Sequence, residues 1–473
     1  MAESPTSPSE RVPPAGLERP PPTADLAEQI EVLLKAAEAL VREGKPEDAE
    51  RVYERVLEHA PHQLAALTFL ALRAHERGDN ERAAGFLLRA TQAAPERPRL
   101  HQNLAVVRRA QGRAEAALAA IDRALTLEPQ APLAHLHRGR ILEDLGRGEE
   151  ALSAYGRAFT LAPPLKSAPL DREPPAFRDL VGRARERLLT VRRRFLERVL
   201  VELEANLGAP LPERAHHFLR VFLGEEPRRF EDPLQKPEFL FYPGLRPRPW
   251  FERGEFPWVR AFEEPWEEIR HEAEALLEER RHRRPYVPSV MRGHPDWAGL
   301  AGSDTWGSIH LYRSGTPVPE VLARCPRTKA TLDALPLASG ANHAPEAFFS
   351  ILEPGTELPP HHGLSNAKLT LHLGLRVPEG TGIEVGDETR TWTEGRSLIF
   401  DDSFRHRAWN RGREARLVLI VDVWHPELSD AERRLVAAMI TTQDYYHRRY
   451  FAPPARPGGA EGTTTDAAPS TPP

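Results

Sequence analysis

The segment Leu369-Thr-Leu-His-Leu-Gly-Leu375 decides the expected fold of the C-terminal part of this chain. Leucine occupies every second position, and His372 lies among the residues between the leucines. Successive side chains of a β-strand point to opposite faces, so this period of two predicts a strand with one apolar face and one polar face that carries His372. Residues 397–400 and 416–424 predict further strands.

Turn signals separate the predicted strands. They are Pro354-Gly355, Gly380-Thr381-Gly382, Gly386-Asp387, Glu394-Gly395 and Asn410-Arg411-Gly412. Short strands joined by regular turns within residues 348–428 are typical of a double-sheet jelly roll, the double-stranded β-helix of cupin-like proteins.

Two histidines and an arginine in this segment suit an iron(II) site. His361 lies in Pro-Pro-His-His-Gly, His406 ends Phe-Asp-Asp-Ser-Phe-Arg-His, and Arg416 follows on the last predicted strand. Imidazoles suit Fe(II), and the usual pattern adds one carboxylate to two histidines, commonly two residues after the first. Gly363 occupies that position, so the usual triad is absent. The arginine suits a dicarboxylate co-substrate.

Several residues near the predicted iron ligands can be interpreted in more than one way. His361 and His362 point to opposite sides of an extended chain, so only one can be a ligand; we favour His361 and expect His362 to face solvent or lie behind the ligand. Asp401 and Asp402 could simply form a turn, where aspartate is common. One of them could instead hold an iron-bound water, and we favour Asp402. Tryptophans usually pack a core, and we expect this of Trp392, as of Trp409 and Trp424.

The N-terminal third contains a repeat with a period of 34 residues. The repeated positions are Gly44, Gly78, Gly112 and Gly146, then Ala49, Ala83, Ala117 and Ala151, then Pro61, Pro95, Pro129 and Pro163. Glycine allows a tight turn after a first helix, alanine lets a second helix approach its neighbour, and proline ends that helix. The pattern resembles four tetratricopeptide repeats over residues 27–165. The array could only stabilise or dimerise the protein, or its concave surface could hold a protein partner.

The fold expected overall is α+β multidomain, with an all-α repeat solenoid followed by the jelly roll. We expect disordered tails at residues 1–26 and 451–473, which are rich in Pro, Ser, Thr, Gly and Ala. Residues 166–235 predict a helical connector, with helix over 176–225 after a proline-bearing linker. Residues 236–450 form the expected catalytic domain, with its core at 348–428 and a helix over 263–279.

Bulk properties exclude several classes of function. The formal net charge of the 473 residues is −5, so no basic field favours nucleic acid. Cys325 is the only cysteine, which excludes an intrachain disulfide framework and a thiolate zinc site. No signal peptide and no run of about 18 apolar residues is visible, so we expect no membrane span and a cytoplasmic location.

Several strings of this chain resemble the aspartyl/asparaginyl β-hydroxylase family. They are Ser350-Ile-Leu-Glu-Pro-Gly-Thr, Pro360-His-His-Gly363, Leu371-His-Leu-Gly-Leu375, Thr391-Trp-Thr-Glu-Gly395, Leu398-Ile-Phe-Asp-Asp-Ser-Phe404, His406 and Val421-Asp-Val-Trp-His-Pro-Glu-Leu428. The resemblance implies an iron(II)- and 2-oxoglutarate-dependent oxygenase in which two histidines hold iron without a protein carboxylate. It implies His361 and His406 as metal ligands, and Ser350, His372 and Arg416 as the residues that bind 2-oxoglutarate. Catalysis would depend on His361, His406 and Arg416.

Two departures from the family concern the substrate. Thr370 stands where the family's animal members carry an arginine, and a cysteine pair of those members is reduced to Cys325, with Ala330 near the second position. Disulfide-bearing domains are therefore a poor guess for the substrate. The resemblance implies hydroxylation of a β-carbon of Asp or Asn in a protein or peptide presented by the repeats. The alternatives are the same chemistry on a small molecule, and a scaffold without activity.

Overall fold

The computed structural model describes residues 24–279, 281–340 and 342–452. The chain divides into two compact units between Glu186 and Arg187. The tails expected at residues 1–26 and 451–473 lie outside the described residues, except that Ala24 begins the first helix and Phe451 ends the last. The predicted boundaries of five domains stay predictions. In the described ranges, no helix is long and apolar enough to cross a membrane.

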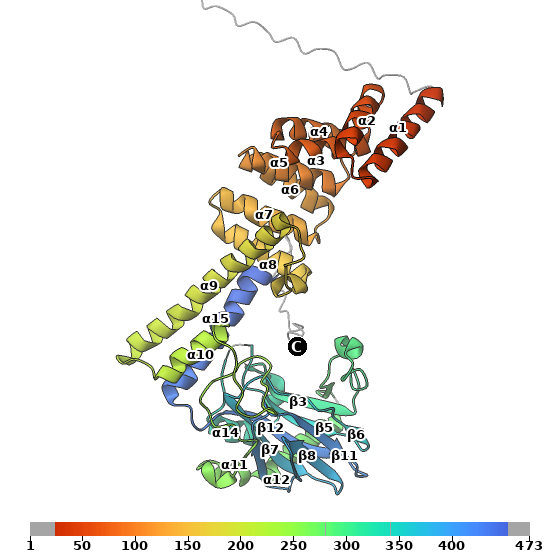
Figure 1. Cartoon of the computed structure of the whole chain (residues 1–473). Coiled ribbons are helices and arrows are strands. Elements are labelled where there is room, and N and C mark those ends of the chain that lie inside the picture. The colour runs from red at the N-terminus through yellow and green to blue at the C-terminus, as the bar shows by residue number, and fades with distance from the viewer. Residues whose placement is uncertain (1–23, 280, 341, 453–473) are drawn as a thin grey trace, which may run out of the picture. The chain divides into compact units, whose positions relative to one another are not determined.

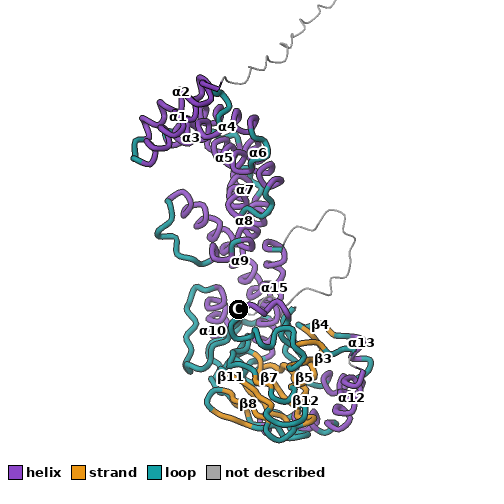
Figure 2. The backbone as a smooth tube through the Cα atoms, turned by 90° about the vertical axis from the view of Figure 1, so that its right-hand side faces the viewer, coloured by secondary structure: helices purple, strands orange, loops and turns teal. Residues whose placement is uncertain are grey.

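Helices in consecutive pairs build the first unit (Figures 1 and 2). They are α1 (Ala24–Arg42), α2 (Pro46–His59), α3 (Leu64–Glu76), α4 (Asn80–Ala93), α5 (Pro98–Ala110), α6 (Ala114–Leu127), α7 (Pro132–Asp144) and α8 (Gly148–Leu161), followed by η1 (Pro163–Lys166). The four repeated glycines all take positive φ, between 71° and 80°, after the first helix of each pair, and the four repeated alanines are buried. The predicted helical repeat array is confirmed.

Gly139 on α7 gives a test of the packing within a helix pair. A methyl group there would overlap the ring of Tyr155, which is buried on α8. Gly139→Ala should therefore destabilise the protein by about 1–3 kcal/mol, although alanine favours helices. Gly85→Ala on α4 is the matched control, because no atom lies within 4 Å of the added methyl, and it should stabilise by up to about 1 kcal/mol. Urea unfolding followed by circular dichroism measures both changes; equal effects would contradict the packing.

Helices of the second unit depart from two predicted boundaries. α9 (Pro175–Leu207) crosses from one unit into the other, and α10 (Glu213–Leu223) follows it. The single helical stretch predicted at 176–225 is thus interrupted, because Gly208 takes φ 66° and prolines stand at 210 and 212. The helix predicted at 263–279 is α12 (Trp266–Glu279), which begins three residues later than predicted, after Pro265; the short α11 (Val259–Glu263) precedes it. The remaining helices are η2 (Arg253–Glu255), η3 (Ser289–Gly293), α13 (Pro319–Leu322), α14 (Pro326–Asp333) and α15 (Asp430–Phe451).

Two antiparallel sheets form the rest of this unit. The larger sheet has the strand order β1 (Trp250–Phe251), β10 (Ser397–Phe400), β7 (Lys368–Arg376), β12 (Arg416–Trp424), β5 (Ala347–Leu352), β3 (Trp306–Arg313) and β2 (Arg284–Pro285), with β4 (Thr316–Pro317) on β3. The smaller sheet has the order β6 (Thr356–Glu357), β11 (His406–Asn410), β8 (Thr381–Val385) and β9 (Glu388–Arg390). The predicted antiparallel β domain is confirmed.

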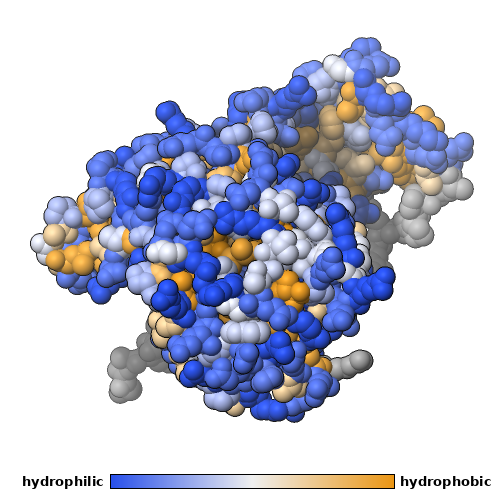
Figure 3. All heavy atoms as spheres, turned by 90° about the horizontal axis from the view of Figure 1, so that it is seen from below, coloured by the Kyte–Doolittle hydropathy of each residue, from blue (hydrophilic) through white to orange (hydrophobic). Residues whose placement is uncertain are grey.

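The two faces of β7 differ as the alternation predicts. Its four leucines are fully buried in a cluster with Ile269, Ala273 and Leu276 of α12. The opposite face belongs to the space between the sheets, where Phe348, Phe400 and Ile420 of the larger sheet meet Ile383 and Val385 of the smaller one. His372 is only 6% exposed. The polar face of this strand is therefore interior, because the second sheet covers it. On the outside, the face seen in Figure 3 is mostly hydrophilic, with apolar atoms in small groups.

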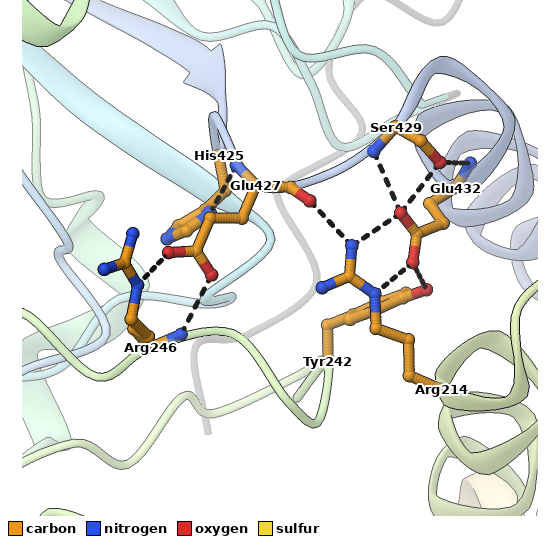
Figure 4. Close-up of polar contacts among 7 residues, drawn as sticks. All are labelled: Arg214, Tyr242, Arg246, His425, Glu427, Ser429 and Glu432. Atoms are coloured by element: carbon orange, nitrogen blue, oxygen red, sulfur yellow. Dashed lines mark hydrogen bonds and ion pairs between the residues drawn. The ribbon is translucent and has the colours of Figure 1, made fainter.

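Glu432 joins α15 to α10 and to the loop before β1 (Figure 4). Its carboxylate accepts hydrogen bonds from Arg214 (Nε to Oε1 2.5 Å, Nη2 to Oε2 2.7 Å), from the Tyr242 hydroxyl (2.8 Å) and from the Ser429 hydroxyl (2.8 Å). The residue is 1% exposed. Burial opposes ionisation, but these donors outweigh it and lower the pKa of Glu432 to about 2.

Replacing Glu432 by glutamine should destabilise the second unit by about 3 kcal/mol at pH 7. The folded pKa lies below the ordinary value of 4.5, so the carboxylate's contribution is complete above about pH 5 and is lost as the pH falls towards 2. The difference between wild type and Glu432→Gln should therefore shrink on acidification. Tryptophan fluorescence during urea unfolding reports on this unit, which holds all eight tryptophans. Asp430→Asn, at an 89% exposed side chain, is the control; a pH-independent difference would contradict the assignment.

Candidate active site

His361 and His406 lie side by side, although they are far apart in the sequence. His406 begins β11, and His361 pairs with it through two backbone hydrogen bonds, His361 N to His406 O at 2.9 Å and the reverse at 2.8 Å. The centroids of the two imidazole rings are 4.1 Å apart. The pairing of the chain at this point therefore brings both predicted ligands to one place between the sheets.

Backbone carbonyls fix the orientation of both imidazoles. Nδ1 of His361 lies 2.8 Å from the carbonyl oxygen of Pro359, and Nδ1 of His406 lies 2.9 Å from that of Phe404. A carbonyl can only accept, so Nδ1 carries the proton in each ring and Nε2 keeps its lone pair. Burial, with the neighbouring His406, lowers the pKa of His361 to about 3, and burial lowers that of His406 to about 4. Both rings are thus neutral at pH 7, the form that binds metals.

The carboxylate of Asp402 fills the place of the missing side chain at Gly363. A Cβ atom on Gly363 would overlap that carboxylate, and Gly363 N donates to the Asp402 carbonyl oxygen at 2.6 Å. Oδ2 of Asp402 lies 3.5 Å from Lys368 Nζ, whereas Oδ1 is buried and has no hydrogen-bond partner among the described residues. Oδ1 of Asp402 is therefore a free hydrogen-bond acceptor at residue 363, the position that carries the carboxylate ligand in the usual iron triad.

Asp401 has a different environment. It is 1% exposed and accepts hydrogen bonds from Gln235 Nε2 (2.8 Å) and from Ser403 N (2.9 Å). Burial raises the pKa of this carboxyl to about 7. The adjacent aspartates are thus distinct, since Asp401 holds the loop before β11 and Asp402 lies beside Gly363.

A buried cation lies elsewhere between the sheets. Arg416, at the start of β12, is 2% exposed, and its Nη2 donates to Ser350 Oγ at 2.9 Å. Ser350 Oγ also accepts from Trp306 Nε1 at 3.1 Å. Nε of Arg416 is buried without a partner in the described part of the chain. Burial lowers the pKa of Arg416 to about 9, so the guanidinium remains charged at neutral pH and has donors to spare for an anion.

Trp392 connects this cation to the third predicted histidine. Its ring lies under the guanidinium of Arg416, 4.7 Å from Cζ to the centroid. Its Nε1 donates to Nδ1 of His372 at 3.2 Å, so Nε2 of His372 carries the proton and can donate. Phe400 lies between His372 and His406, with ring centroids 4.9 and 6.0 Å away. The structure thus brings Ser350, His372 and Arg416 together beside the two facing histidines.

Sequence reasoning missed two aromatic residues of this site. Trp392 was expected only to pack a core; it is buried, but it also contacts Arg416 and His372 because β10 and its preceding turn lie next to β7. Trp297 has its ring 5.0 Å from that of His361, nearly perpendicular, in a segment to which the sequence assigned no individual role. His361 and His362 are both partly exposed, so the choice of His361 as the ligand depends on its pairing with His406. Only Trp392 had a signal in the sequence, within Thr391-Trp-Thr-Glu-Gly395.

No group of three or more His, Cys, Asp or Glu side chains within residues 24–279, 281–340 and 342–452 is arranged to hold a metal ion. The fit to a metal therefore depends on two imidazoles with free Nε2 atoms and on the unpartnered oxygen of Asp402. The metal ligands predicted at His361 and His406 stay a prediction.

Comparison with known proteins gives matches for both units. Residues 263–426 match the family model described as aspartyl/asparaginyl beta-hydroxylase, and residues 34–98 and 103–165 match a tetratricopeptide repeat model. The chain is 35% identical to the human aspartyl/asparaginyl beta-hydroxylase over 200 residues, 41% of this chain and 25% of that protein. It is 36% identical to human aspartate beta-hydroxylase domain-containing protein 2 over 205 residues, 42% of this chain and 54% of that protein.

A bacterial relative is of similar identity. The ornithine lipid ester-linked acyl 2-hydroxylase of Rhizobium tropici is 34% identical over 195 residues, which are 41% of this chain and 66% of that protein. The match thus spans a quarter to about two thirds of the length of these three relatives.

Proposed function

We propose that this chain, whose residues 263–426 belong to the aspartyl/asparaginyl beta-hydroxylase family, is a hydroxylase that uses iron(II) and 2-oxoglutarate. The observation that carries the proposal is the pair His361 and His406, with rings 4.1 Å apart and both Nδ1 protons held by carbonyls. Two neutral imidazoles oriented in this way suit iron(II) and leave coordination positions open.

Asp402 would act on the metal through water. Its free Oδ1 is an acceptor at the place where the usual triad supplies a ligand, so it would hold a water on the metal and help to keep the two-histidine site charge-balanced. When bound, the metal would supply oxygen activation: the oxidative decarboxylation of 2-oxoglutarate to succinate and carbon dioxide would take up one oxygen atom of O2, and the other would be inserted into a C–H bond of the substrate. The protein binds and orients the reactants and excludes water.

Arg416 would bind the distal carboxylate of 2-oxoglutarate. Its guanidinium is buried with one nitrogen unpartnered, and a buried charge without a counter-ion is costly, so an anion is expected there. The Ser350 hydroxyl lies at hydrogen-bond distance from the same guanidinium and would donate to that carboxylate. His372, with its proton on Nε2, would donate to another oxygen of the co-substrate.

The substrate we favour is an Asp or Asn residue of a protein or peptide, hydroxylated at the β-carbon and presented by the helical repeats. The support is the family of residues 263–426 together with the repeat array, since such arrays bind protein partners. A second candidate is the same chemistry on a small molecule, which is favoured by the lipid in the name of the Rhizobium relative. A scaffold without activity is disfavoured by the joint retention of Ser350, His361, His372, His406 and Arg416.

Asp402→Asn tests the proposed role of this carboxylate. The change should weaken iron(II) binding by roughly 10- to 100-fold, because the water on the metal loses a charged acceptor. Asp401→Asn is the matched control and should bind iron(II) within a few fold of wild type, since Asp401 holds the backbone rather than the metal site. Anaerobic iron(II) titration of the full chain, with 2-oxoglutarate conversion to succinate measured in parallel, gives both numbers. Equal iron affinities of the two variants would contradict the role given to Asp402.

A further inference from the structure

A second set of polar side chains lies on the interior face of the larger sheet, one pleat beyond His372. Thr370 is the next interior residue of β7, and it pairs with Phe400 of β10 and with Asp422 of β12. Lys368 is the next again on the same strand. Lys368 Nζ lies 3.5 Å from Asp402 Oδ2, and Asp402 fills the space at Gly363, so this set adjoins the two-histidine site. Along β7 it lies on the other side of His372 from Arg376, which pairs with Leu417 next to Arg416.

The only cation of this set is already neutralised. Lys368 is 8% exposed, and its Nζ donates to Asp422 Oδ1 at 2.8 Å and lies 3.5 Å from Asp402 Oδ2. Burial opposes its charge, but Asp402 and Asp422 outweigh burial and raise the pKa of Lys368. One positive charge thus faces two carboxylates, and Lys368 has no unbalanced charge to offer a further anion.

A third carboxyl group, that of Glu346, lies next to Asp422. Glu346, next to the start of β5, has its Oε1 at hydrogen-bond distance from Ser314 N (2.5 Å), and its own backbone N donates to Asp422 Oδ2 at 3.3 Å. Burial raises the pKa of Glu346 to about 7. Nε2 of His310 lies 3.5 Å from Oε2 of Glu346. Burial lowers the pKa of His310 to about 4, so this imidazole is neutral at pH 7 and does not balance the carboxyl group. With its raised pKa, Glu346 is only partly ionised at pH 7, and the excess of negative charge comes mainly from Asp402 and Asp422, which share the single cation Lys368. A substrate carboxylate would meet like charge there.

Apart from the carboxylate oxygen Oδ1 of Asp402, the polar atoms without partners in this set are uncharged. Thr370 Oγ1 and His343 Nε2 are buried and have no hydrogen-bond partner among the described residues. The ring of His343 packs on Phe239 at 5.1 Å, and its pKa is lowered to about 4 by burial. A hydroxyl and a neutral imidazole can each donate or accept, so together they suit a group that does both, such as a carboxamide.

We propose that the substrate group seated beside Thr370, His343 and Lys368 is an uncharged carboxamide, and that this site rejects the corresponding carboxylate. The proposal depends on the proposed function, of which it specifies the substrate: an asparagine-like rather than an aspartate-like side chain. A carboxylate would lose its water and gain no cation, whereas a carboxamide would complete the hydrogen bonds that Thr370 and His343 lack.

The test compares three small probes that differ only in their head groups: the N-acetyl N-methylamides of asparagine, aspartate and 2,4-diaminobutyrate. Binding to the full chain at pH 7.5 is measured by ligand-observed NMR, which needs neither iron nor 2-oxoglutarate. We expect the asparagine probe to bind at least 10-fold more tightly than either charged probe. Equal binding, tighter binding of a charged probe, or no binding of any probe would overturn the inference.

A cation placed at Thr370 gives the second arm. Thr370→Arg should reduce the preference for the asparagine over the aspartate probe by at least 10-fold, because it supplies the missing positive charge. Thr389→Arg, at an exposed position of β9, is the matched control and should leave the preference unchanged. If Thr370→Arg leaves the preference for the asparagine probe unchanged, or if Thr389→Arg reduces it equally, the head group of the probe does not bind beside Thr370. The iron and 2-oxoglutarate titration reports separately on the proposed function, so the two can fail independently.

Discussion

Replacing His406 by alanine is expected to remove iron(II) binding and to lower 2-oxoglutarate turnover by roughly 1000-fold or more. His406 is one of only two imidazoles proposed to hold the metal, and a bound metal contributes several kcal/mol to such a reaction. The change leaves the backbone pairing of β11 with His361 in place, since that pairing uses only main-chain atoms. Iron content after desalting and succinate formation measure the two effects.

His362→Ala is the control for that variant. It removes the imidazole next to His361, which points to the opposite side of an extended chain from the one that faces His406. It should therefore bind iron(II) and turn over like wild type. Equal loss in His362→Ala and His406→Ala, or retention of iron by a folded His406→Ala, would show that the metal site is misassigned.

Replacing Arg416 by alanine is expected to raise the 2-oxoglutarate concentration needed for half-maximal turnover by roughly 100- to 1000-fold. This corresponds to about 3–4 kcal/mol, the size of a buried, charge-assisted hydrogen-bonded pair. The guanidinium is buried against Ser350 and Trp392, so alanine would remove the positive charge that we assign to the co-substrate carboxylate. Iron(II) affinity in the absence of 2-oxoglutarate should change little, because Arg416 is not a ligand.

Arg413→Ala separates charge loss in general from loss of this contact. Arg413 is exposed in the turn before β12, so its removal lowers the net charge equally without touching the interior. The Arg413→Ala variant should need the same 2-oxoglutarate concentration for half-maximal turnover as wild type. If Arg416→Ala saturates at wild-type concentrations, the co-substrate does not bind where we place it.

Local patterns explain why much of the fold could be predicted. The 34-residue period requires a positive φ at each repeated glycine, and Gly44 and its equivalents have it. The alternation from Leu369 to Leu375 requires a strand, and β7 occupies those residues. The helix boundaries that were wrong depend on a few residues: Gly208 and the prolines that follow it separate α9 from α10, and Pro265 sets the later start of α12.

Long-range contacts explain what the sequence did not reveal about the site. That Asp402 fills the space beside Gly363 depends on how the loop before β11 approaches the chain after β6. That Lys368 is neutralised depends on the register of β7 with β12. Neither the contact of Asp402 with Gly363 nor that of Lys368 with Asp422 leaves a periodic signal in the sequence. Spacing alone could suggest Asp402 as a residue of the site, but it could not show which residues Asp402 contacts. The cytoplasmic location and a partner on the helical repeats stay predictions.

An anaerobic titration of the purified chain with iron(II) and 2-oxoglutarate, followed by visible absorption, tests the proposed iron site most directly, with His406→Ala beside it. We predict a saturable metal-to-ligand charge-transfer band in wild type and no band in the variant. A folded wild-type protein that is supplied with iron and shows no band would contradict the proposed function, and the helical repeats would then become the best guide to what this chain does.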